Sequence, residues 1–404
     1  MMMLNIPPYA AAVIEALEKN GHEAFAVGGC IRDTLLGRTP NDWDVTTSAR
    51  PDEVRRLFSF LYGFSAIPTG IAHGTVTVLS EGKPVEVTTY RIDGEYTDHR
   101  RPDSVEFCKD LESDLSRRDF TVNAMAFSGS VGLVDPFGGA DDLKGRIIRC
   151  VGDPKRRFSE DALRILRAVR FASVLGFDVE SKTAEAALGM RGELSLVSRE
   201  RVCSELSKLI CGVKAAEVAD KFFPIIEEIL PNLRVIDRCL LTDSLEKLKG
   251  EHLPLMLSAL LTECDADEAR AMLRELRFDK KTCSRASLIL ENRGFVPDSK
   301  AAVKRLCRNI GTEAAEDVIR LGIARSEIAA FALCYLEEIR LLNECVSIPQ
   351  LLVDGGDIRS LGADGRTVGQ ILDYILDKVI EGELENSRDA LIPAIKQYIY
   401  NLEN

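Results

Sequence analysis

Two aspartates, Asp42 and Asp44, lie two residues apart in the stretch NDWDVTTSA, where tryptophan, valine and threonine favour a β-strand. Side chains at positions i and i+2 of a strand share a face, so we expect both carboxylates on one face and Trp43 on the other, in a core. Two adjacent carboxylates disfavour each other's ionised form unless a positive charge lies nearby. Because Mg²⁺ binds one or two carboxylates together with water and phosphate oxygens, the pair predicts a magnesium site. The alternative is two solvated side chains on an edge strand.

A glycine pair precedes these aspartates in the stretch AFAVGGCIRDTLLGR. An apolar strand is predicted to end at Gly28 and Gly29, followed by a short helix with Arg32 and Asp33 in its first turn. Glycines let a phosphate approach the backbone, and a helix N-terminus offers free N–H groups and a favourable dipole. The P-loop pattern is absent, and a glycine pair is often only a turn. Beside an Asp-x-Asp pair, however, it predicts the phosphate cradle that nucleotidyl transfer requires.

A third carboxylate, Glu86, lies in the alternating stretch PVEVTTY. If this strand pairs beside the one that carries the aspartates, Glu86 faces the same site. There it would either activate the attacking hydroxyl or complete a two-metal arrangement. The alternative is a polar residue on a solvent-facing strand surface.

The stretch DLSRRDFTVNAMAF places Arg117, Arg118 and Asp119 at the start of a predicted helix, with Asn123 four residues beyond Asp119. The planar fork of arginine suits phosphate or ribose recognition. Asp119 and Asn123 would position those groups or bond sugar hydroxyls. By itself, the R-R-D triplet is also typical of a helix cap on a charged surface.

The stretch RRFSEDALRILRAVRF predicts one helix with Ser159 as its N-cap. Asp161 and Arg164, at positions i and i+3, are then neighbours on its surface. Asp161 would accept a hydrogen bond from the exocyclic amine of cytosine or adenine while Arg164 donates to the ring nitrogen. Uracil and guanine present a carbonyl beside an N–H, which mismatches both residues. The pair therefore predicts selection of C and A, with an ordinary surface ion pair as the alternative.

Two further arginines, Arg167 and Arg170, follow on the same predicted helix. Each three-residue step turns about −60° around a helix, so these two side chains leave the small base site. We expect them to reach the triphosphate, the RNA end or the adjoining domain.

The elements that must position these residues fall into two halves. The first 150 residues alternate strand-like runs with turns and short helices, which predicts a small α/β or α+β unit with a mixed sheet. After about Gly152 strand signals nearly vanish and helical spacing continues to the C-terminus. The predicted strands are AFAVGG, DWDVTT, HGTVTVLS, PVEVTTY and SVEF, with EGK as a hairpin turn, and the predicted helices span 8–20, 31–36 and 52–58.

Composition narrows the class of protein. No apolar run approaches the roughly 18 residues of a membrane span, and the N-terminus lacks the basic region of a signal peptide, so we expect a cytoplasmic protein without membrane contact. The eleven cysteines form no C-x-x-C pair and the four histidines are too far apart for a zinc motif, so any metal must be held by oxygen. With a net charge of −12, an RNA partner would need a local basic surface.

In their order, these motifs resemble the class II tRNA nucleotidyltransferases, the bacterial CCA-adding enzymes. The resemblance is continuous over about 24–180, and beyond about 210 only the helical character and VDGGDIRSLGADGRTVGQILDYIL are similar. It implies an α+β fold, with a polymerase-β-like nucleotidyltransferase head at 1–150, a helical neck for base recognition at 151–212 and a helical body and tail for tRNA binding at 213–404. It rests on VGGCIRDTLLGR, NDWDVTTSARPDEV, HGTVTV, EVTTYRIDGEYTDHRRPDSVEF, DLSRRDFTVNAMAF, LVDPFGGADDLKGRIIR and RFSEDALRILRAVRFASVLGF.

The resemblance also implies an activity and roles for the residues above. The 3′-hydroxyl of tRNA would attack the α-phosphate of CTP or ATP without a nucleic-acid template, and pyrophosphate would leave on the Gly28–Gly29 side. The body would hold the acceptor stem, and GEYTDHRRP matches the flexible head loop of full CCA-adding enzymes. The implied roles are Mg²⁺ binding for Asp42 and Asp44, triphosphate binding for Gly29, Arg32 and Arg118, base recognition for Asp161 and Arg164, and a nucleotide-binding helix for Arg167 and Arg170.

Three rival functions remain at this point. A bacterial poly(A) polymerase shares the head, but residues 371–404 hold seven acidic and three basic residues, which favours a compact tRNA enzyme over one that binds long RNA. A partial enzyme would add only the two cytidines or only the adenosine. A non-catalytic RNA-binding relative would not need Asp42, Asp44, Asp161 and Arg164, all of which are intact.

Overall fold

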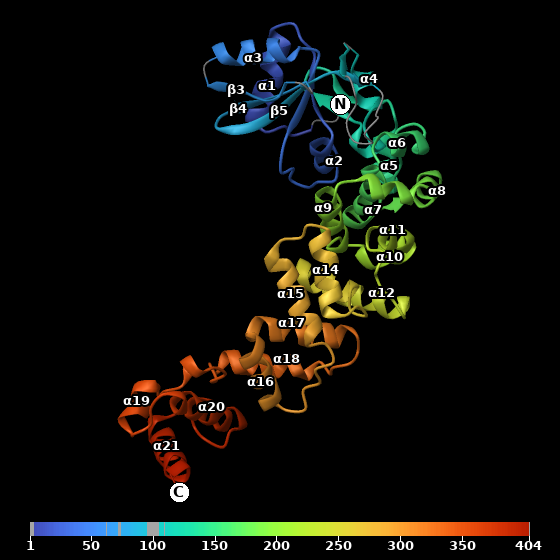
Figure 1. Ribbon diagram of the computed structural model, residues 1–404. Coiled ribbons are helices and arrows are strands. Elements are labelled where there is room, and N and C mark those ends of the chain that lie inside the picture. Colours follow the sequence, from blue (N-terminus) through green and yellow to red (C-terminus); the bar gives the residue numbers. More distant parts are fainter. Residues whose placement is uncertain (1–3, 62, 72–73, 95–104, 109, 404) are drawn as a thin grey trace. The chain divides into compact units, whose positions relative to one another are not determined.

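The computed structural model describes residues 4–61, 63–71, 74–94, 105–108 and 110–403 (Figure 1). Its contacts divide the chain into two compact units, Met1–Asn232 and Leu233–Asn404, which we call the N-terminal and C-terminal units. The finer division at residues 150 and 212 stays a prediction. None of the helices in the described ranges is both long and apolar enough to cross a membrane.

The N-terminal unit contains a seven-stranded mixed sheet in the order β3-β4-β5-β2-β1-β8-β9. β2 and β5 pair in parallel, whereas the other neighbours are antiparallel, which confirms the predicted mixed sheet. The strands are β1 (Ala24–Val27), β2 (Asp44–Thr47), β3 (Phe64–Gly70), β4 (Thr75–Ser80), β5 (Lys83–Thr89), β8 (Ala126–Ser128) and β9 (Gly132–Val134).

The hairpin between β4 and β5 confirms the predicted turn at EGK. Glu81 and Gly82 have φ angles of 53° and 74°, the left-handed pair that a tight two-residue hairpin requires. Strand β2 begins at Asp44, two residues later than predicted, so Asp42 and Trp43 precede it. Strands β3, β8 and β9 lacked a clear alternating signal and were not predicted.

Both faces of the central strand β1 are covered, which explains why all four of its residues are buried. Phe25 and Val27 share a face and join a core cluster with Leu111 and Leu115. Helix α1 (Pro8–Lys19) also contacts β1, and α1 buries its own apolar side chains. α1, α2 (Gly29–Leu35) and α3 (Pro51–Phe60) confirm the three predicted helices of the head, and α4 (Leu111–Ser116) is additional.

Helices dominate the rest of the N-terminal unit. α7 (Leu163–Leu175) buries almost every residue and packs against α9 (Arg199–Ile210). Two short strand pairs interrupt the helices, β6 (Arg91–Asp93) with β7 (Val105–Phe107) and β10 (Ile147–Ile148) with β11 (Asp178–Val179). The helices are α5 (Gly139–Gly145), α6 (Pro154–Glu160), α7 (Leu163–Leu175), α8 (Ser181–Gly189), α9 (Arg199–Ile210), α10 (Ala215–Lys221) and α11 (Phe223–Ile229).

The C-terminal unit is helical throughout its described residues, as predicted. One of its cores contains Ile371, Ile375 and Leu376 from the buried face of α20 (Arg366–Glu381), together with Leu391 and Ile395 of α21 (Arg388–Glu403). The helices are α12 (Arg238–Lys247), α13 (Leu253–Leu260), α14 (Ala266–Glu275), α15 (Lys280–Glu291), α16 (Lys300–Ile310), α17 (Thr312–Ala324), α18 (Phe331–Leu341), α19 (Gly355–Ser360), α20 (Arg366–Glu381) and α21 (Arg388–Glu403).

Candidate active site

The sheet brings two of the candidate carboxylates side by side. Asp44 and Glu86 are directly paired in the parallel register of β2 and β5, so their side chains leave the same face. Asp42 and Glu86 are exposed and Asp44 is partly buried, while Trp43 is only 4% exposed, which confirms that it enters a core. Asp44, the first residue of β2, and Glu86, in the middle of β5, therefore lie on an accessible face of the sheet, and Asp42 lies two residues before Asp44.

The electrostatics of this face suit a cation. Burial, and then the charges of Glu86 and Asp42, raise the pKa of Asp44 to about 6, while Arg118 lowers it. A divalent cation would relieve this repulsion between carboxylates. In the described part of the chain no three histidine, cysteine, aspartate or glutamate side chains form a metal-binding group. Asp42 and Asp44 fit Mg²⁺ nevertheless, because that ion takes only one or two carboxylates and keeps water and phosphate oxygens.

The predicted phosphate cradle lies next to this face. Gly28 has a φ of 82° and directly precedes α2, and a Cβ at this position would lie 2.9 Å from Nη1 of Arg118. Arg118 also pairs with Asp114 at 3.5 Å, yet its buried Nε has no hydrogen-bond partner within the described structure. A glycine at position 28 therefore lets a guanidinium approach the N-terminus of α2, where an anion would satisfy both.

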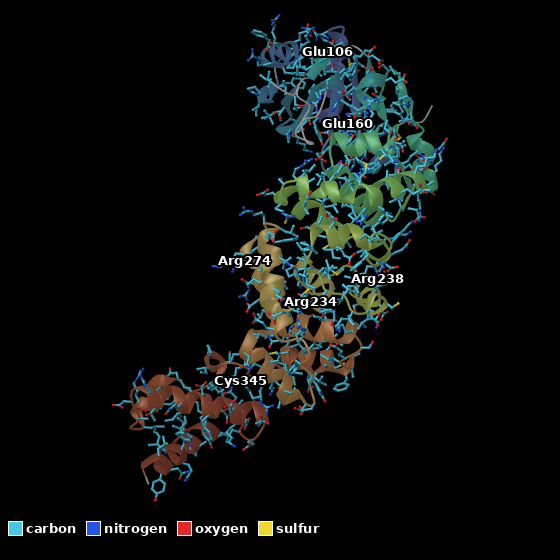
Figure 2. All side chains as sticks on the ribbon, turned by 45° about the vertical axis from the view of Figure 1, so that its right-hand side comes forward. Glu106, Glu160, Arg234, Arg238, Arg274 and Cys345 are labelled. Carbon is cyan, nitrogen blue, oxygen red and sulfur yellow. The ribbon has the colours of Figure 1, made fainter. Side chains whose placement is uncertain are left out.

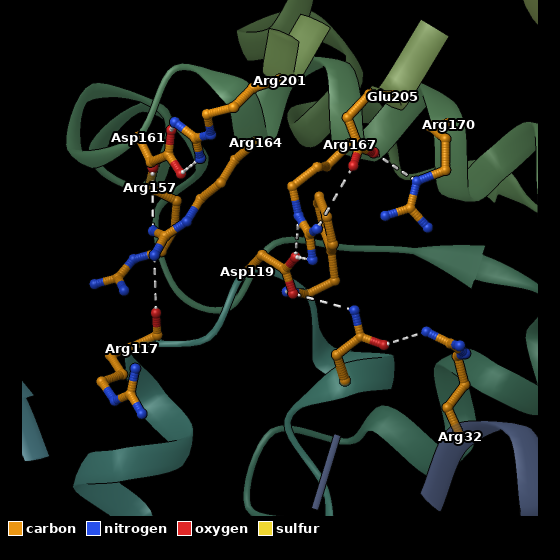
Figure 3. A network of polar contacts seen from close by, with 12 residues as sticks. Arg32, Arg117, Asp119, Arg157, Asp161, Arg164, Arg167, Arg170, Arg201 and Glu205 are labelled. Carbon is orange, nitrogen blue, oxygen red and sulfur yellow. Dashed lines mark hydrogen bonds and ion pairs between the residues drawn. The ribbon is translucent and has the colours of Figure 1, made fainter. Parts of the chain in front are cut away.

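A chain of hydrogen bonds leads from α2 into the helices that follow the sheet (Figure 3). Arg32 pairs with Asp33 and donates from Nη1 to Oδ1 of Asn123 at 2.7 Å. Asn123 donates from Nδ2 to Oδ1 of Asp119 at 3.1 Å, and Nε of Arg167 donates to the other oxygen at 2.8 Å. Burial raises the pKa of Asp119, but the charge of Arg167 and its hydrogen bonds outweigh this and lower it to about 2.

The helix predicted to begin at Arg117 is wrong. α4 ends at Ser116, and only a 3₁₀ turn, Thr121–Asn123, follows. The reason is long-range pairing, since Phe120 forms a β-bridge with Cys150 and the carbonyl of Asp119 accepts from the N–H of Val151. The contact between Asp119 and Asn123 that the helix was meant to supply is made by the turn instead.

The single helix predicted across the stretch RRFSEDALRILRAVRF is also wrong. α6 ends at Glu160, Asp161 has extended backbone angles (φ −144°, ψ 103°), and α7 begins at Leu163. Ser159 lies inside α6 and donates to the carbonyl of Arg156, so it is not an N-cap. Oδ1 of Asp161 accepts from the N–H of Leu163 at 3.1 Å, the local side-chain bond by which aspartate competes with a continuous helix.

The side chains of Asp161 and Arg164 are each held by partners other than one another. Arg164 donates to Glu160 at 2.7 Å, to the carbonyl of Arg157 at 3.2 Å and to the carbonyl of Arg117 at 3.0 Å. Asp161 accepts two hydrogen bonds from Arg201. The alternative of an ordinary ion pair between Asp161 and Arg164 is therefore not observed among the described contacts, and both side chains are fixed independently (Figure 3).

Arg167 and Arg170 are engaged inside the protein. Arg167 binds Asp119, and Nε of Arg170 donates to Glu205 on α9 at 2.6 Å. The guanidinium of Arg170 also lies 3.5 Å from the ring centroid of Phe171. Their predicted part in nucleotide binding stays a prediction, and in this structure both join α7 to its neighbours.

Sequence reasoning missed two residues of α9, the guanidinium of Arg201, which binds Asp161, and the carboxylate of Glu205, which binds Arg170. The sequence signal that could have found Glu205 was weak. Glu205 lies among Val202, Leu206 and Leu209, the buried face of α9, and a charged residue at such a position indicates a buried partner. Residues 95–102 of the predicted head loop lie outside the described part of the chain.

Two family models match parts of the N-terminal unit. Residues 24–149 match the family model of the poly A polymerase head domain, and residues 176–230 match a model described as a probable RNA and SrmB-binding site of polymerase A. The CCA-adding enzyme of Leuconostoc mesenteroides is 34% identical, and the match covers 96% of this chain and 96% of the relative. That of Geobacillus stearothermophilus is 36% identical, with 95% and 96% covered.

A solved structure agrees with these relatives. The structure of the Bacillus stearothermophilus CCA-adding enzyme in complex with CTP matches with a TM-score of 0.77 at 30% identity, over 98% of this chain and 99% of that chain. The agreement therefore spans both units of the chain. With relatives above 30% identity over almost its whole length, the protein belongs to the family of CCA-adding enzymes.

Proposed function

We propose that this chain adds C, C and A to the 3′ end of tRNA from CTP and ATP, in the cytoplasm and with Mg²⁺ as its metal ion. The observation that carries the proposal is the parallel pairing of Asp44 with Glu86, beside the Gly28–Arg118 contact. Carboxylates that would hold a metal thus lie within electrostatic reach of Arg118, a donor for phosphate, which supports nucleotidyl transfer. The family supplies the substrate class, since its relatives are CCA-adding enzymes.

Asp42 and Asp44 would hold Mg²⁺. When bound, this ion acts as a Lewis acid at the α-phosphate and favours ionisation of the attacking hydroxyl. Glu86 lies in register with Asp44 and either takes the proton of the 3′-hydroxyl or completes the metal site. The 3′-oxygen bonds to the α-phosphorus as the bond to the bridging oxygen breaks, and the electron pair leaves with pyrophosphate.

The triphosphate would lie along the N-terminus of α2. Gly29 is its first helical residue and presents a backbone N–H, and the positive end of the helix favours an anion. Arg118 would bring its partly exposed guanidinium to the phosphate beside Gly28, and Arg32 is held by Asn123. Arginine suits this role because it donates several hydrogen bonds from one rigid plane.

Asp161 and Arg164 would recognise the base, now as two separately fixed side chains at the α6–α7 junction. Three described hydrogen bonds occupy Nη1 and Nη2 of Arg164, which leaves N–H donors on a guanidinium that carries five. An acceptor on Asp161 and a donor on Arg164 match the amine and the ring nitrogen shared by cytosine and adenine.

Residues 213–404 would hold the tRNA acceptor stem, with 1–150 as the catalytic head and 151–212 as the neck. The exposed side chains of the C-terminal unit include Arg234, Arg238 and Arg274 (Figure 2). Such cations on an otherwise acidic protein offer local contacts to the phosphate backbone. Because the whole chain carries a net charge of −12, binding would depend on a few local cations and not on general coating of the RNA, and its salt dependence would be modest.

The test is an incubation of the protein with tRNA that lacks its CCA end, with CTP and ATP added separately or together. We expect two added nucleotides with CTP alone and three with both. Long products from ATP alone would identify a poly(A) polymerase, and products limited to two cytidines or one adenosine would identify a partial enzyme. No product under any condition would contradict the proposed activity.

A further inference from the structure

Arg201 on α9 forms a two-pronged ion pair with Asp161. Its Nη1 donates to Oδ1 at 3.2 Å and its Nη2 donates to Oδ2 at 2.7 Å, across 40 residues of sequence. The two side chains are 24% and 14% exposed, so the pair is largely shielded from water. A parallel pair of this kind fixes the plane of the carboxylate as well as its position.

The backbone holds only one oxygen of the Asp161 carboxylate. The residue lies in extended conformation between α6 and α7. Besides Arg201, its described partner is the N–H of Leu163, which donates to Oδ1 at 3.1 Å. Without Arg201, rotation about the side-chain bonds would exchange the two oxygens and move the acceptor away from a base.

The ion pair with Arg201 leaves part of the hydrogen-bonding capacity of the Asp161 carboxylate unused. A carboxylate has two oxygens and about four lone-pair sites. Oδ1 accepts from Arg201 and Leu163, and Oδ2 accepts from Arg201, so one site remains, on Oδ2. A carboxylate bound to a guanidinium is ionised, so it accepts hydrogen bonds and donates none. It therefore suits the amine of cytosine or adenine and mismatches the carbonyl of uracil or guanine.

We propose that Arg201 is a positioning residue for nucleotide selection, which acts by holding Asp161 so that a single acceptor faces the base. The proposal rests on the proposed role of Asp161 in base recognition. Arg201 does not hold Arg164, whose partners belong to α6 and to the turn at Arg117. Base selection then depends on α9, an element that need not touch the nucleotide.

The experiment measures kcat/KM for single incorporation of CTP and UTP into tRNA that ends before its CCA. The variants are Arg201→Gln, Arg201→Lys, Asp161→Ala and the double variant Asp161→Ala with Arg201→Gln. Lys208→Gln is the matched control, because it removes one exposed positive charge from the same helix. Circular dichroism of each variant reports whether the N-terminal unit is folded.

We expect Arg201→Gln to lower the preference for CTP over UTP by about tenfold. This is the effect of losing one hydrogen bond to a charged group, here the bond from the base to the Asp161 carboxylate. Arg201→Lys should restore part of it, since an ammonium still pairs with the carboxylate. Lys208→Gln should keep the parental preference. In the Asp161→Ala background the second substitution should cause no further loss, because its target is already absent.

The outcomes separate this inference from the function on which it rests. If Asp161→Ala loses selectivity and Arg201→Gln keeps it, the positioning role is overturned while base recognition by Asp161 stands. If the double variant loses selectivity additively, Arg201 acts independently of Asp161 and the inference fails. If Arg201→Gln instead binds CTP more tightly with unchanged selectivity, Arg201 is only a group that the nucleotide displaces. Should Arg201→Gln not fold, parental selectivity in Arg201→Lys at a lowered melting temperature would mark a purely structural residue.

Discussion

The carboxylate face of the sheet and the α6–α7 junction are built in different ways. On the sheet, the parallel register of two strands sets Asp44 beside Glu86, and the backbone alone determines their neighbourhood. At the junction, the backbone leaves the helix and ion pairs hold the side chains, above all Asp161 with Arg201. A site placed by strand register tolerates changes around it, whereas a site placed by ion pairs depends on residues far away in sequence.

The largest effect is expected at the sheet. Replacing Asp42 or Asp44 by alanine should lower nucleotide addition by at least about a thousandfold, because a metal contributes several kcal/mol of charge stabilisation in the transition state. Binding of tRNA, measured by filter retention, should persist because the fold is set by the strands. Asp52→Ala, an exposed aspartate on α3, is the control. Normal turnover in either variant would remove the metal assignment.

A smaller effect is expected at Gly28, between β1 and the proposed phosphate site. Gly28→Ala places a Cβ 2.9 Å from Arg118 and should raise KM for CTP about tenfold by displacing that guanidinium. Gly37→Ala is a matched control, since its φ of 71° is also positive but its Cβ would meet nothing within 4 Å. Both variants carry backbone strain of about 1–3 kcal/mol. If both raise KM equally, strain rather than the Arg118 contact controls phosphate binding.

The stability that the ion pair between Asp119 and Arg167 contributes should depend on pH, unlike the neighbourhood that strand register sets in the sheet. The pKa of Asp119 is lowered to about 2, so its pair with Arg167 contributes stability above the ordinary aspartate pKa and loses it as the pH falls toward 2. A shift of this size corresponds to about 2 kcal/mol. In urea unfolding, Arg167→Gln should therefore be less stable than the parent at pH 6, and the gap should narrow between pH 4 and pH 2.

The control for the acid experiment is Lys144→Gln, which removes an exposed ion pair with Asp141. That pair lies in water and should show little dependence on pH in the same range. A gap between parent and Arg167→Gln that stays constant from pH 6 to pH 2 would mean that Asp119 is not held ionised by Arg167.

The same contrast explains how far the sequence could predict the structure. Around the sheet, the EGK turn and the buried Trp43 follow from local turn chemistry and alternation. The mixed sheet and the helical character of the rest are confirmed for the same reason. The pairing that sets Glu86 beside Asp44 joins distant residues, and the sequence offered it only as one of two alternatives.

Around α6 and α7 the decisive contacts are long-range. Helical spacing runs through RRFSEDALRILRAVRF without a glycine or proline, and only the side chain of Asp161 breaks it. The turn at 117–123 depends on pairing with residues about thirty positions later, through Phe120 and Cys150. Arg201 lies 40 residues from its partner, a separation at which one sequence carries no pairing signal.

The most direct test of base selection by protein side chains is single-nucleotide incorporation by Asp161→Ala, compared with the parent for CTP, UTP, ATP and GTP. The substrate is tRNA that ends before its CCA. Asp178→Ala, an exposed aspartate in the same unit, is the control. The preference for CTP over UTP should fall by about ten- to a hundredfold, because each good polar pair is worth roughly 1–3 kcal/mol of discrimination, while addition remains measurable. A variant as selective as the parent would contradict the account and place selection of C and A elsewhere in the protein.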